Sequence, residues 1–462
     1  MNLGSGEKIN LKMNKERSGG NRKYKWSKYN LTVPTHKKNF LLYNTANQKM
    51  MTSEQSFERR ENYYTDGAPL AKGDDKLVDL GFLVEESIDE FAKQRFDYQQ
   101  HQGDRSQQII VMPTEQCNFR CVYCYEEFLK GTMEPELQEG LISWVKANIS
   151  NWDNLAISWF GGEPLVGYSV IENVSPQIIE LCKENNVKYT SGMTTNGFLL
   201  NIEKAKKLYD MGVRSYQITV DGTEDYHDQT RVLMGGQKTY SKIMKNLLDI
   251  KDSDLDVSIK VRMNFSSFNT ENISDFLDEL SSNFKSDPRF TFDLQPVGQW
   301  GGPNDEELPI CTSNQANLIE IDKTWEGIEK GIPTTKFLDA LRPNNVCYAA
   351  KENSLVIGSD GIIYKCTVAF NNPMNHVGQL HPNGEIELDM YKFSQWVSLD
   401  GATDPHCQSC QVAPICHGSF CPLVRIEHGK DTRPCPPLKS NLEAYVKNLY
   451  KQITFSKEEV KQ

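Results

Sequence analysis

The sequence predicts an α/β fold whose centre is a (β/α) barrel or a six-strand partial barrel. From residue 107 onward, apolar segments typical of strands alternate six times with segments of helical periodicity. Each strand and the helix after it occupy about 25 to 40 residues, a spacing typical of parallel strands joined by right-handed crossovers. A third observation concerns the C-terminal part, where seven of the twelve cysteines lie between Cys347 and Cys435. We therefore expect a cysteine-rich domain after the barrel.

Composition limits the class of protein. The 462 residues leave room for about three domains, and 38% hydrophobic with 24% charged residues is typical of a folded globular chain. No apolar run approaches the roughly 20 residues of a membrane span and no secretory signal is evident, so we expect a cytoplasmic protein without a membrane partner. With 51 basic and 62 acidic side chains the net charge is -11, which disfavours nucleic acid as a partner.

Basic residues concentrate at the N-terminus. Residues 1–38 carry ten Lys or Arg against only Glu7 and Glu16, and we expect residues 1–23 to form a flexible basic tail. Two short strands are predicted at 29–33 and 40–44, on either side of a turn-prone segment, and a helical region follows them. These elements predict a small separate domain over residues 24–105.

The barrel elements follow in order. The six strands are expected at Gln107–Met112, Leu155–Phe160, Val187–Met193, Val213–Val220, Val257–Met263 and Phe290–Leu294. Helical periodicity between them includes Pro135–Asn148 and Ile202–Met211. In barrels of this kind, the functional side chains lie in the loops that follow the carboxyl ends of the strands.

The loop after the first barrel strand has the spacing Cys-x3-Cys-x2-Cys, formed by Cys117, Cys121 and Cys124. In a reducing compartment such cysteines indicate metal ligation or redox chemistry rather than disulfides. Three thiolates in one short loop can bind a 4Fe-4S cluster and leave one iron open to a ligand that is not protein. A zinc ion is the alternative, and it would need a fourth ligand such as His101 or His227.

This loop, with Tyr123 before its last cysteine, resembles the signature of the radical S-adenosylmethionine (SAM) superfamily. The resemblance implies a partial (β/α)6 barrel of the TIM type over residues 106–345, the radical SAM core. It also implies that SAM chelates the open iron and is cleaved to a 5'-deoxyadenosyl radical, which takes a hydrogen atom from the substrate.

Later loops agree with the resemblance, because each follows a successive predicted strand. Gly161-Gly162-Glu163-Pro164 resembles the loop that holds the methionine amino group, for which Glu163 or neighbouring carbonyls are the acceptors. Arg231 lies where relatives place an arginine against the SAM carboxylate. By this resemblance the residues expected to bind SAM are Tyr123, Gly161, Gly162, Glu163, Pro164, Thr195, Asn196, Asp221 and Arg231.

The C-terminal cysteines resemble the SPASM extension, which holds two auxiliary 4Fe-4S clusters in enzymes that modify peptides and proteins. The resemblance implies a SPASM domain over residues 346–462 and three 4Fe-4S clusters in the whole chain. Cys347, Cys366 and Cys421 would hold the first auxiliary cluster, and Cys407, Cys410, Cys416 and Cys435 the second. A pair of zinc knuckles is the alternative for this region.

The sequence departs from the SPASM pattern at two points. Four residues separate Cys416 from Cys421, where the family pattern has three. In addition, residues 348–355 lack the extra cysteine that fully ligated relatives carry shortly after the position of Cys347. Either the first auxiliary cluster has an open iron, or Cys311 completes it.

The resemblance implies an enzyme that modifies a ribosomally synthesised precursor peptide. Formation of a thioether to a peptide cysteine is the leading prediction. Carbon–carbon crosslinking and epimerisation are alternatives, as is a reaction like that of sulfatase maturases, although those enzymes carry an Asp where this chain has Thr367. A zinc-stabilised peptide-binding adaptor without catalysis is the alternative outside enzymes, and no catalytic acid or base is assigned.

Two partners follow from the same resemblance. Residues 24–105 resemble the small winged-helix-like domain that recognises the leader of a precursor peptide, and strand addition is the physical basis for such recognition. The cluster also requires an electron donor such as flavodoxin or ferredoxin.

Overall fold

The structure, a computed structural model, describes residues 22–35, 39–285 and 287–459. These residues pack as two compact units divided between Glu90 and Phe91. The expected tail at 1–23 lies outside the described residues except for Arg22 and Lys23. The division places nearly all of the helix at residues 90–102 in the larger unit. The end of the leader-recognition domain, expected at residue 105, stays a prediction. Within the described part of the chain, no helix is long and apolar enough to cross a membrane.

The smaller unit contains two antiparallel three-stranded sheets, in the strand orders β5-β1-β6 and β2-β3-β4. Both strands predicted for this region are present as β2 and β3, and β3 buries four successive residues. The elements are β1 (Lys23–Trp26), β2 (Asn30–Pro34), β3 (Phe40–Asn44), β4 (Met50–Ser53), α1 (Glu58–Tyr64), β5 (Ala68–Pro69), α2 (Asp75–Asp79) and β6 (Leu83–Glu85).

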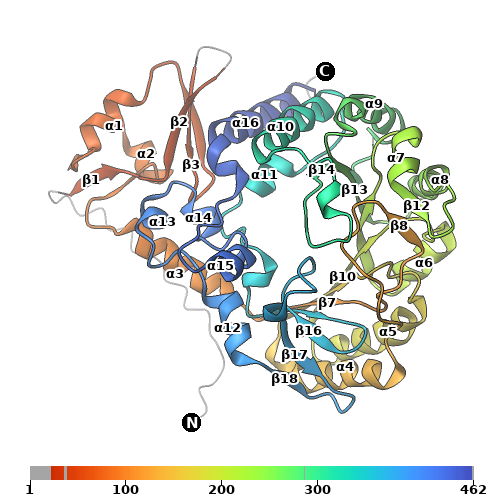
Figure 1. Ribbon diagram of the computed structural model, residues 1–462. Coiled ribbons are helices and arrows are strands. Elements are labelled where there is room, and N and C mark those ends of the chain that lie inside the picture. Colours follow the sequence, from red (N-terminus) through yellow and green to blue (C-terminus); the bar gives the residue numbers. More distant parts are fainter. Residues whose placement is uncertain (1–21, 36–38, 286, 460–462) are drawn as a thin grey trace, which may run out of the picture. The chain divides into compact units, whose positions relative to one another are not determined.

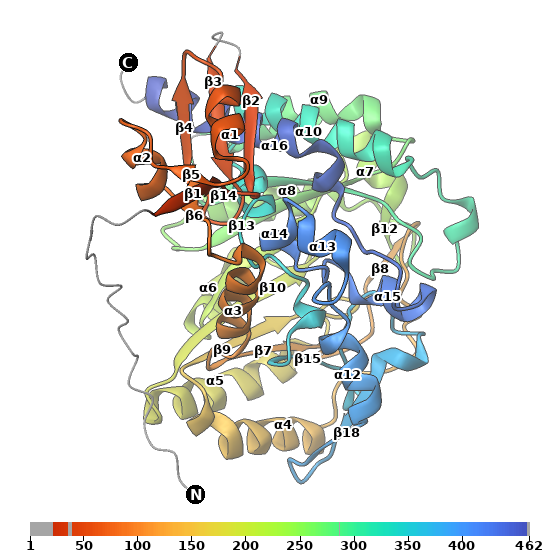
Figure 2. The same ribbon diagram turned by 90° about the vertical axis from the view of Figure 1, so that its left-hand side faces the viewer.

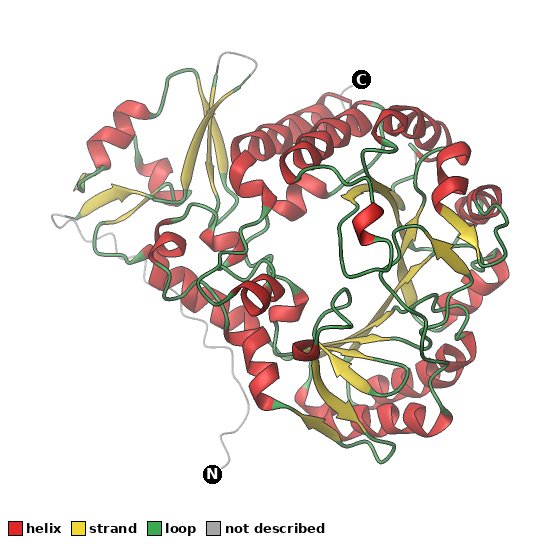
Figure 3. Cartoon of the chain, viewed as in Figure 1, coloured by secondary structure: helices red, strands yellow, loops and turns green. Residues whose placement is uncertain are grey.

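The larger unit is built on a sheet in which six parallel strands are neighbours in chain order, as predicted. The strands are β7 (Ser106–Val111), β9 (Asn154–Trp159), β10 (Lys188–Thr195), β11 (Val213–Thr219), β13 (Ser258–Phe265) and β14 (Phe290–Pro296). The helices that precede, connect and follow them are α3 (Glu90–Gln102), α4 (Pro135–Asn148), α5 (Tyr168–Glu184), α6 (Ile202–Asp210), α7 (Glu224–Thr230), α8 (Tyr240–Lys251), α9 (Ile273–Phe284) and α10 (Ser313–Glu329). Figure 3 shows the helices α4 to α10 outside the strands.

The two faces of the barrel strands differ in chemistry. Along β13, residues 259, 261, 263 and 265 are buried and apolar, whereas Lys260, Arg262 and Asn264 alternate with them on the opposite face. Helix α9 covers the apolar face with five buried residues at helical spacing, from Ile273 to Phe284. Parallel strands packed on both faces are apolar throughout, so the polar alternation indicates that the inner face of this sheet surrounds a polar interior.

The sheet continues into the cysteine-rich part of the chain. Strand β15 (Ser354–Ile357) pairs in parallel with β7, and β16 (Ile362–Tyr364), β17 (His376–Leu380) and β18 (Ile386–Leu388) extend the sheet antiparallel. The remaining helices are α11 (Lys336–Ala340), α12 (Met390–Ser398), α13 (Pro405–Ser409), α14 (Ala413–Cys416), α15 (Pro422–His428) and α16 (Leu442–Glu459). Figures 1 and 2 show α13, α14 and α15 next to one another. One sheet therefore spans both regions that the sequence analysis treats as separate domains.

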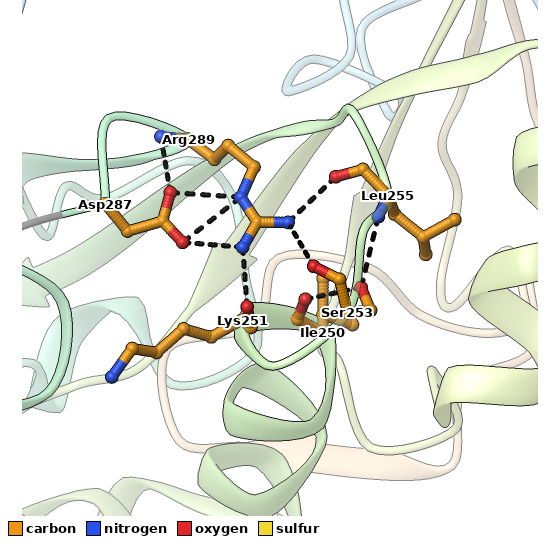
Figure 4. A network of polar contacts seen from close by, with 6 residues as sticks. All are labelled: Ile250, Lys251, Ser253, Leu255, Asp287 and Arg289. Atoms are coloured by element: carbon orange, nitrogen blue, oxygen red, sulfur yellow. Dashed lines mark hydrogen bonds and ion pairs between the residues drawn. The ribbon is translucent and has the colours of Figure 1, made fainter.

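An arginine fixes the loops at the amino ends of β13 and β14 (Figure 4). The Arg289 guanidinium donates to both carboxylate oxygens of Asp287 at 2.6–3.1 Å. It also donates to the carbonyl oxygens of Lys251, Ser253 and Leu255 at 2.6–3.0 Å. Because these carbonyls belong to the loop before β13, the side chain joins two consecutive barrel loops.

Candidate SAM and cluster sites

A short two-stranded ribbon shapes the loop that carries the first three cysteines. Strand β8 (Phe119–Cys121) pairs antiparallel with β12 (Arg231–Leu233), and in this register Cys121 lies opposite Arg231. Burial raises the pKa of the Cys117 thiol, and its neighbours Cys121 and Cys124 raise it further because the three thiolates would repel one another. Three partly buried thiols in one short loop become thiolates when a cation or a metal cluster compensates their charge.

Tyr123 connects three polar residues: Asp221, which follows β11, Arg231 on β12 and Asn264 on β13. Its hydroxyl donates to Asp221 Oδ2, and it accepts from Arg231 Nη1 at 2.8 Å and from Asn264 Nδ2 at 3.1 Å. Asp221 Oδ1 in turn accepts from the Asn264 backbone amide at 3.0 Å. Burial raises the pKa of Tyr123 well above its usual range, so the hydroxyl keeps the proton that it donates. The network brings together three residues that the sequence analysis assigned to SAM and adds Asn264.

A buried histidine supports this network from behind. His227 Nδ1 accepts from the Asp221 backbone amide at 3.1 Å, which places the ring proton on Nε2. Nε2 then donates to Thr239 Oγ1 at 3.0 Å, and the Thr239 hydroxyl donates to the Arg231 carbonyl at 2.6 Å. Burial lowers the pKa of His227 well below its usual range, and Arg231 lowers it further, so the ring is neutral. His227 therefore positions Asp221 and Arg231.

The two glycines after β9 allow two loops to pack tightly. Gly161 has a φ of 123°, and a Cβ on it would lie 2.4 Å from the Thr114 carbonyl oxygen. A Cβ on Gly162 would lie 2.4 Å from the Glu115 carbonyl oxygen and 2.6 Å from that of Gln116. Because Thr114 to Gln116 lead directly into Cys117, the absence of side chains here sets the distance between the glycine turn and the cysteine loop.

Glu163 acts as a bridge between loops in this structure. Its Oε1 accepts from Thr195 Oγ1 at 2.7 Å and from the Leu165 amide at 3.0 Å, and its Oε2 accepts from the Asn196 amide at 2.7 Å. The side chain is fully buried. The carboxylate thus joins the glycine turn to the segment that follows β10, and the main-chain carbonyls between Gly161 and Pro164 are further candidate acceptors for an amino group.

Asn196 extends from this junction to the first cysteine. Its Nδ2 donates to Asn118 Oδ1 at 2.8 Å and lies 4.0 Å from Cys117 Sγ. The Phe119 amide also donates to Cys117 Sγ, at 3.3 Å. Amide donors to a ligating sulfur tune the potential of an iron–sulfur cluster, so the surroundings of Cys117 fit a cluster ligand.

A cavity of about 300 Å³ lies beside the Tyr123 network. Tyr123, Asp221 and Asn264 form its polar wall, and Phe268 and Leu308 contribute to its apolar wall. The volume is at the lower end of the range for small-ligand pockets, and the combination of apolar walls with a few polar groups is typical of them. The Arg231 guanidinium has one buried nitrogen, Nε, without a hydrogen-bond partner. Arg231 does not itself line the cavity, but its side chain donates to Tyr123, which does. The size of the cavity fits a small ligand such as SAM.

The first C-terminal cysteine group is Cys347, Cys366 and Cys421. Cys347 precedes the 3-10 turn Tyr348–Ala350, Cys366 follows β16 and Cys421 precedes α15. Burial raises the pKa of Cys347 to about 12, and Cys366 and Cys421 contribute to the rise. Burial raises the pKa of Cys366 to about 11, again with a contribution from Cys421. The fold thus brings together the three cysteines grouped by the resemblance.

The extra residue before Cys421 is accommodated by the backbone. His417 and Gly418 both have left-handed φ angles, of 49° and 71°, and these two residues turn the chain after α14. His417 is buried rather than facing solvent, because its ring stacks on Tyr98 and its Nε2 lies 2.8 Å from Asn344 Oδ1.

The second C-terminal group lines a small cavity. Its walls include Cys407, Cys410, Cys416 and Cys435, together with the cationic side chains of Arg425, Arg433 and Lys439. Burial raises the pKa of Cys416 to about 12, with contributions from the other three cysteines. Lys439 Nζ donates to Cys435 Sγ at 3.4 Å. Four thiols facing one cavity among cations fit a four-thiolate cluster, whose negative charge those cations would offset.

The two remaining cysteines lie elsewhere. The helical spacing of Cys182 with Ile178, Ile179 and Leu181 predicts a small buried apolar residue, and Cys182 is indeed buried on α5 within the apolar core. Burial raises the pKa of Cys311, whereas the pKa of Cys347 also responds to Cys366 and Cys421. In the described ranges, no three His, Cys, Asp or Glu side chains meet at the spacing of ligands around a single metal ion. One zinc ion holds its ligands around one centre, whereas a 4Fe-4S cluster offers a separate iron to each thiolate.

Sequence reasoning missed four residues of the first site. Asn118, Thr239 and Asn264 were not considered, and His227 was considered only as a zinc ligand. Asn264 could have been found, because it follows Lys260 and Arg262 on the polar face of β13 near that strand's carboxyl end. No sequence signal marks the other three: the partner of Asn118 is 78 residues away, and although His227 and Thr239 lie within 12 residues of their partners, no periodic pattern links them.

Comparison with known proteins agrees with this geometry. The sequence profile of the radical SAM superfamily matches residues 111–280. Fe-coproporphyrin III synthase of Methanosarcina barkeri is 24% identical over 249 residues, which cover 54% of this chain and 58% of that protein, less than two thirds of its length. Radical SAM cyclopropyl synthase TigE of Paramaledivibacter caminithermalis is 21% identical over 401 residues, 79% of each chain.

Two solved structures share the fold. Native anSMEcpe with bound AdoMet and Cp18Cys peptide has a TM-score of 0.57 and 17% identity, covering 76% of this chain and 99% of that one. Streptococcus suis SuiB bound to precursor peptide SuiA has a TM-score of 0.50 and 14% identity, covering 90% of this chain and 99% of that one. The radical SAM profile thus matches the part of the chain that carries the three-cysteine loop and most of the barrel, and the two solved structures share its fold.

Proposed function

We propose that this enzyme modifies a ribosomally synthesised precursor peptide by forming a thioether between a peptide cysteine and the carbon of another residue. The observation that carries the proposal is the division of ten cysteines into groups of three, three and four. Two groups thus have one thiol fewer than a fully ligated 4Fe-4S cluster. The first would leave an iron for SAM, and the second an iron for the substrate.

The residues that would hold the cofactors are those of the first site. Cys117, Cys121 and Cys124 would bind the first cluster, and the cavity beside Tyr123 would bind SAM. When bound, SAM and this cluster supply a 5'-deoxyadenosyl radical that takes a hydrogen atom from the peptide. Phe268 and Leu308 give that cavity an apolar wall, and the nearby Arg231 guanidinium is a donor of the kind that binds a carboxylate.

The thioether assignment depends on a missing fourth thiol at Cys347, Cys366 and Cys421. Cys366 and Cys421 contribute to the raised pKa of Cys347, and Cys421 contributes to that of Cys366, whereas burial raises the pKa of Cys311. The proposal takes these three thiols as one group that does not include Cys311. A metal site that binds a thiol deprotonates it and fixes the sulfur atom, and a fixed sulfur gains a large orientational advantage in bond formation.

The surroundings of Thr367 support a reaction unlike that of sulfatase maturases. Thr367 stands where those enzymes carry an Asp. Its Oγ1 lies 2.7 Å from Tyr348 Oη, and its amide donates to the same hydroxyl at 2.8 Å. A hydroxyl group is a weaker base than a carboxylate. Thr367 and Tyr348 therefore cannot take a proton as readily as an Asp at this position would.

Carbon–carbon bond formation is the second candidate. The relative named a radical SAM cyclopropyl synthase aligns over 79% of this chain, whereas Fe-coproporphyrin III synthase aligns over 54%. This candidate requires a first C-terminal cluster whose four irons are all ligated by protein, with Cys311 or another group as the fourth ligand.

The small unit is proposed to bind the leader of the peptide. Each of its two sheets has edge strands, β2 and β4 in one and β5 and β6 in the other, to which an extended peptide can add. Binding there would raise the effective concentration of the modified segment at the barrel. Deletion of residues 1–90 should weaken precursor binding and leave uncoupled SAM cleavage; unchanged peptide affinity would rule the idea out. Reduction of the first cluster would come from a donor such as flavodoxin or ferredoxin.

The cluster assignment is tested by iron analysis. If all three sites fill, the anaerobically reconstituted protein should hold about twelve irons per chain. Replacement of Cys117, Cys121 and Cys124 together by Ala should remove roughly a third of the iron and abolish conversion of SAM to 5'-deoxyadenosine. Cys182→Ala is the matched control and should keep both. A colourless, iron-free wild-type protein would instead favour the zinc-stabilised adaptor, and SAM cleavage by the triple variant would contradict the assignment.

The reaction type is tested with precursor peptides. A cysteine-containing precursor should perturb the electron paramagnetic resonance signal of the first C-terminal cluster, and its Cys-to-Ser version should not. The product should lose two hydrogen atoms and one free thiol, both measurable by mass spectrometry and thiol labelling. Cys311→Ala should leave the iron content unchanged. If Cys311→Ala destroys that cluster, carbon–carbon bond formation becomes the better assignment.

A further inference from the structure

A second cavity, of about 330 Å³, lies on the inner face of β13 and β14. The barrel contributes Lys260, Arg262 and Asp293 to its wall, and the segments beside the C-terminal cysteines contribute Phe420, Pro437 and Leu438. The cavity is thus enclosed partly by the barrel and partly by the cysteine-rich region. None of its lining residues lines the SAM cavity beside Tyr123.

The charges of this wall are partly paired with one another. Arg262 donates through Nε and Nη2 to Asp293 Oδ2, both at 3.1 Å. Lys336 Nζ lies 3.2 Å from Asp293 Oδ1 and also pairs with Glu320. Burial raises the pKa of Glu320, but Lys336 and Arg262 oppose the rise. These contacts satisfy both carboxylates from within the protein.

Two cationic groups keep unused donors. Lys260 has no carboxylate within 4.0 Å among the residues that the structure describes, and Arg262 Nη1 makes no hydrogen bond to any of them. The wall therefore holds three cations, Lys260, Arg262 and Lys336, against two paired carboxylates. The third acidic lining residue, Asp339, is paired with Arg342 at 2.6 Å and is neutralised there. The donors left over attract one negative charge.

The same face of β13 leads from this cavity to the SAM site. Residues two apart on a strand point to one side, and Lys260, Arg262 and Asn264 alternate with buried apolar residues. Asn264 donates to Tyr123 and lines the SAM cavity, whereas Lys260 and Arg262 line the second cavity. At about 3.3 Å per residue, the two cationic positions lie roughly 7 and 13 Å along the strand from Asn264.

We infer that this cavity binds the carboxylate side chain of an Asp or Glu in the substrate peptide and thereby sets which residue reaches the SAM site. The inference rests on the proposed function for the nature of the substrate. An extended peptide also advances about 3.3 Å per residue. The acidic residue therefore lies about two to four positions from the residue that is modified. Phe420 and Leu438 pack against the apolar part of the same peptide segment.

The test is a binding selection that needs no knowledge of the natural substrate. A display library of random decapeptides is selected on the anaerobically reconstituted full-length enzyme, and the bound sequences are compared with the input. The wild type should enrich Asp and Glu severalfold. Lys260→Glu should lose this enrichment and enrich Lys and Arg instead, a reversal that misfolding cannot produce. Lys242→Gln changes an exposed lysine on α8 and should select like the wild type.

Synthetic peptides then measure the size of the effect. In an enriched peptide, exchange of the acid for its amide should weaken binding to the wild type about tenfold, the usual order for one charge-assisted hydrogen bond. Amidation of the peptide's C-terminus should leave its affinity for the enzyme unchanged. If amidation weakens binding and exchange of the side-chain acid does not, the assignment is overturned. Absence of acid enrichment on the wild type, or retained acid preference in Lys260→Glu, would also overturn it.

The outcome is separable from that of the proposed function. The selection reads peptide binding alone, whereas the proposed function is tested by 5'-deoxyadenosine and by the modified product. An enzyme that modifies a peptide without any acidic preference would contradict only the inference. Where a modified peptide is obtained, tandem mass spectrometry should find the acid two to four residues from the modified position.

Discussion

Removal of the Tyr123 hydroxyl is expected to damage the SAM site without removing a cluster ligand. In Tyr123→Phe, three hydrogen bonds are lost at one atom, those to Asp221, Arg231 and Asn264. Asp221 and Arg231 are both buried, and each makes its polar link to the other through this hydroxyl. The substitution therefore leaves a buried carboxylate and a buried guanidinium with one partner fewer each.

The magnitude follows from the number and kind of these bonds. A hydrogen bond to a charged group contributes about 1.5–3 kcal/mol, and a neutral one about 1 kcal/mol. The neighbouring cavity admits water to part of the network, which offsets some of the loss. We expect the free energy of unfolding to fall by about 3 kcal/mol, equivalent to a decrease in Tm of roughly 3–4 °C for a unit of this size. The dissociation constant for SAM should rise about tenfold, because Asn264 and Asp221 lose the group that positions them.

The assay is thermal unfolding of the anaerobically reconstituted protein, with SAM affinity measured by equilibrium dialysis. Tyr391→Phe is the matched control, because this tyrosine is 69% exposed and its change should stay within about 0.5 kcal/mol. The iron content of Tyr123→Phe should equal that of the wild type. A variant with wild-type Tm and wild-type SAM affinity would refute the role of this hydroxyl.

Two further substitutions test the packing around the site. Gly162→Ala should lower the free energy of unfolding by about 1–3 kcal/mol and reduce the iron retained after gel filtration, because its Cβ would lie 2.4 Å from the Glu115 carbonyl oxygen. Gly131→Ala is the control, because its Cβ meets open space, and it should change neither quantity. Arg289→Ala should lower the free energy of unfolding by about 2 kcal/mol at neutral pH. Arg289 holds the pKa of Asp287 below its usual range, so this stabilisation is present above about pH 4 and is lost as pH falls further. The difference between wild type and variant in denaturant unfolding should therefore narrow at acidic pH, and a difference independent of pH would contradict the ion pair.

Periodic features of the fold were predictable because they are local. Helix α4 has the predicted bounds, and all six barrel strands begin and end close to the expected positions. Cys182 was correctly placed in the core from its helical neighbours. Each of these depends on residues a few positions apart, whose periodicity records which face is buried.

The role of Glu163 was not predictable in the same way. The resemblance leaves open whether Glu163 or neighbouring carbonyls accept from the SAM amino group, and in the structure the carboxylate also accepts from Thr195, Asn196 and Leu165. A sequence motif identifies the loop and leaves open which atom of the loop is free, because that depends on donors that a neighbouring strand supplies.

The sequence by itself determined the class of chemistry, since thiols at fixed short spacing can surround a cluster wherever the loop lies. It also determined the order of the barrel, since alternating strands and helices leave few topologies. Only the tertiary structure decided the partners of the charged groups. Tyr123 and Asn264 are 141 residues apart, and the β8–β12 pairing brings Arg231 to Cys121. The unmatched donors of Lys260 and Arg262 likewise appear only when the chain has folded, because pairing is a property of distances that the order of residues does not specify.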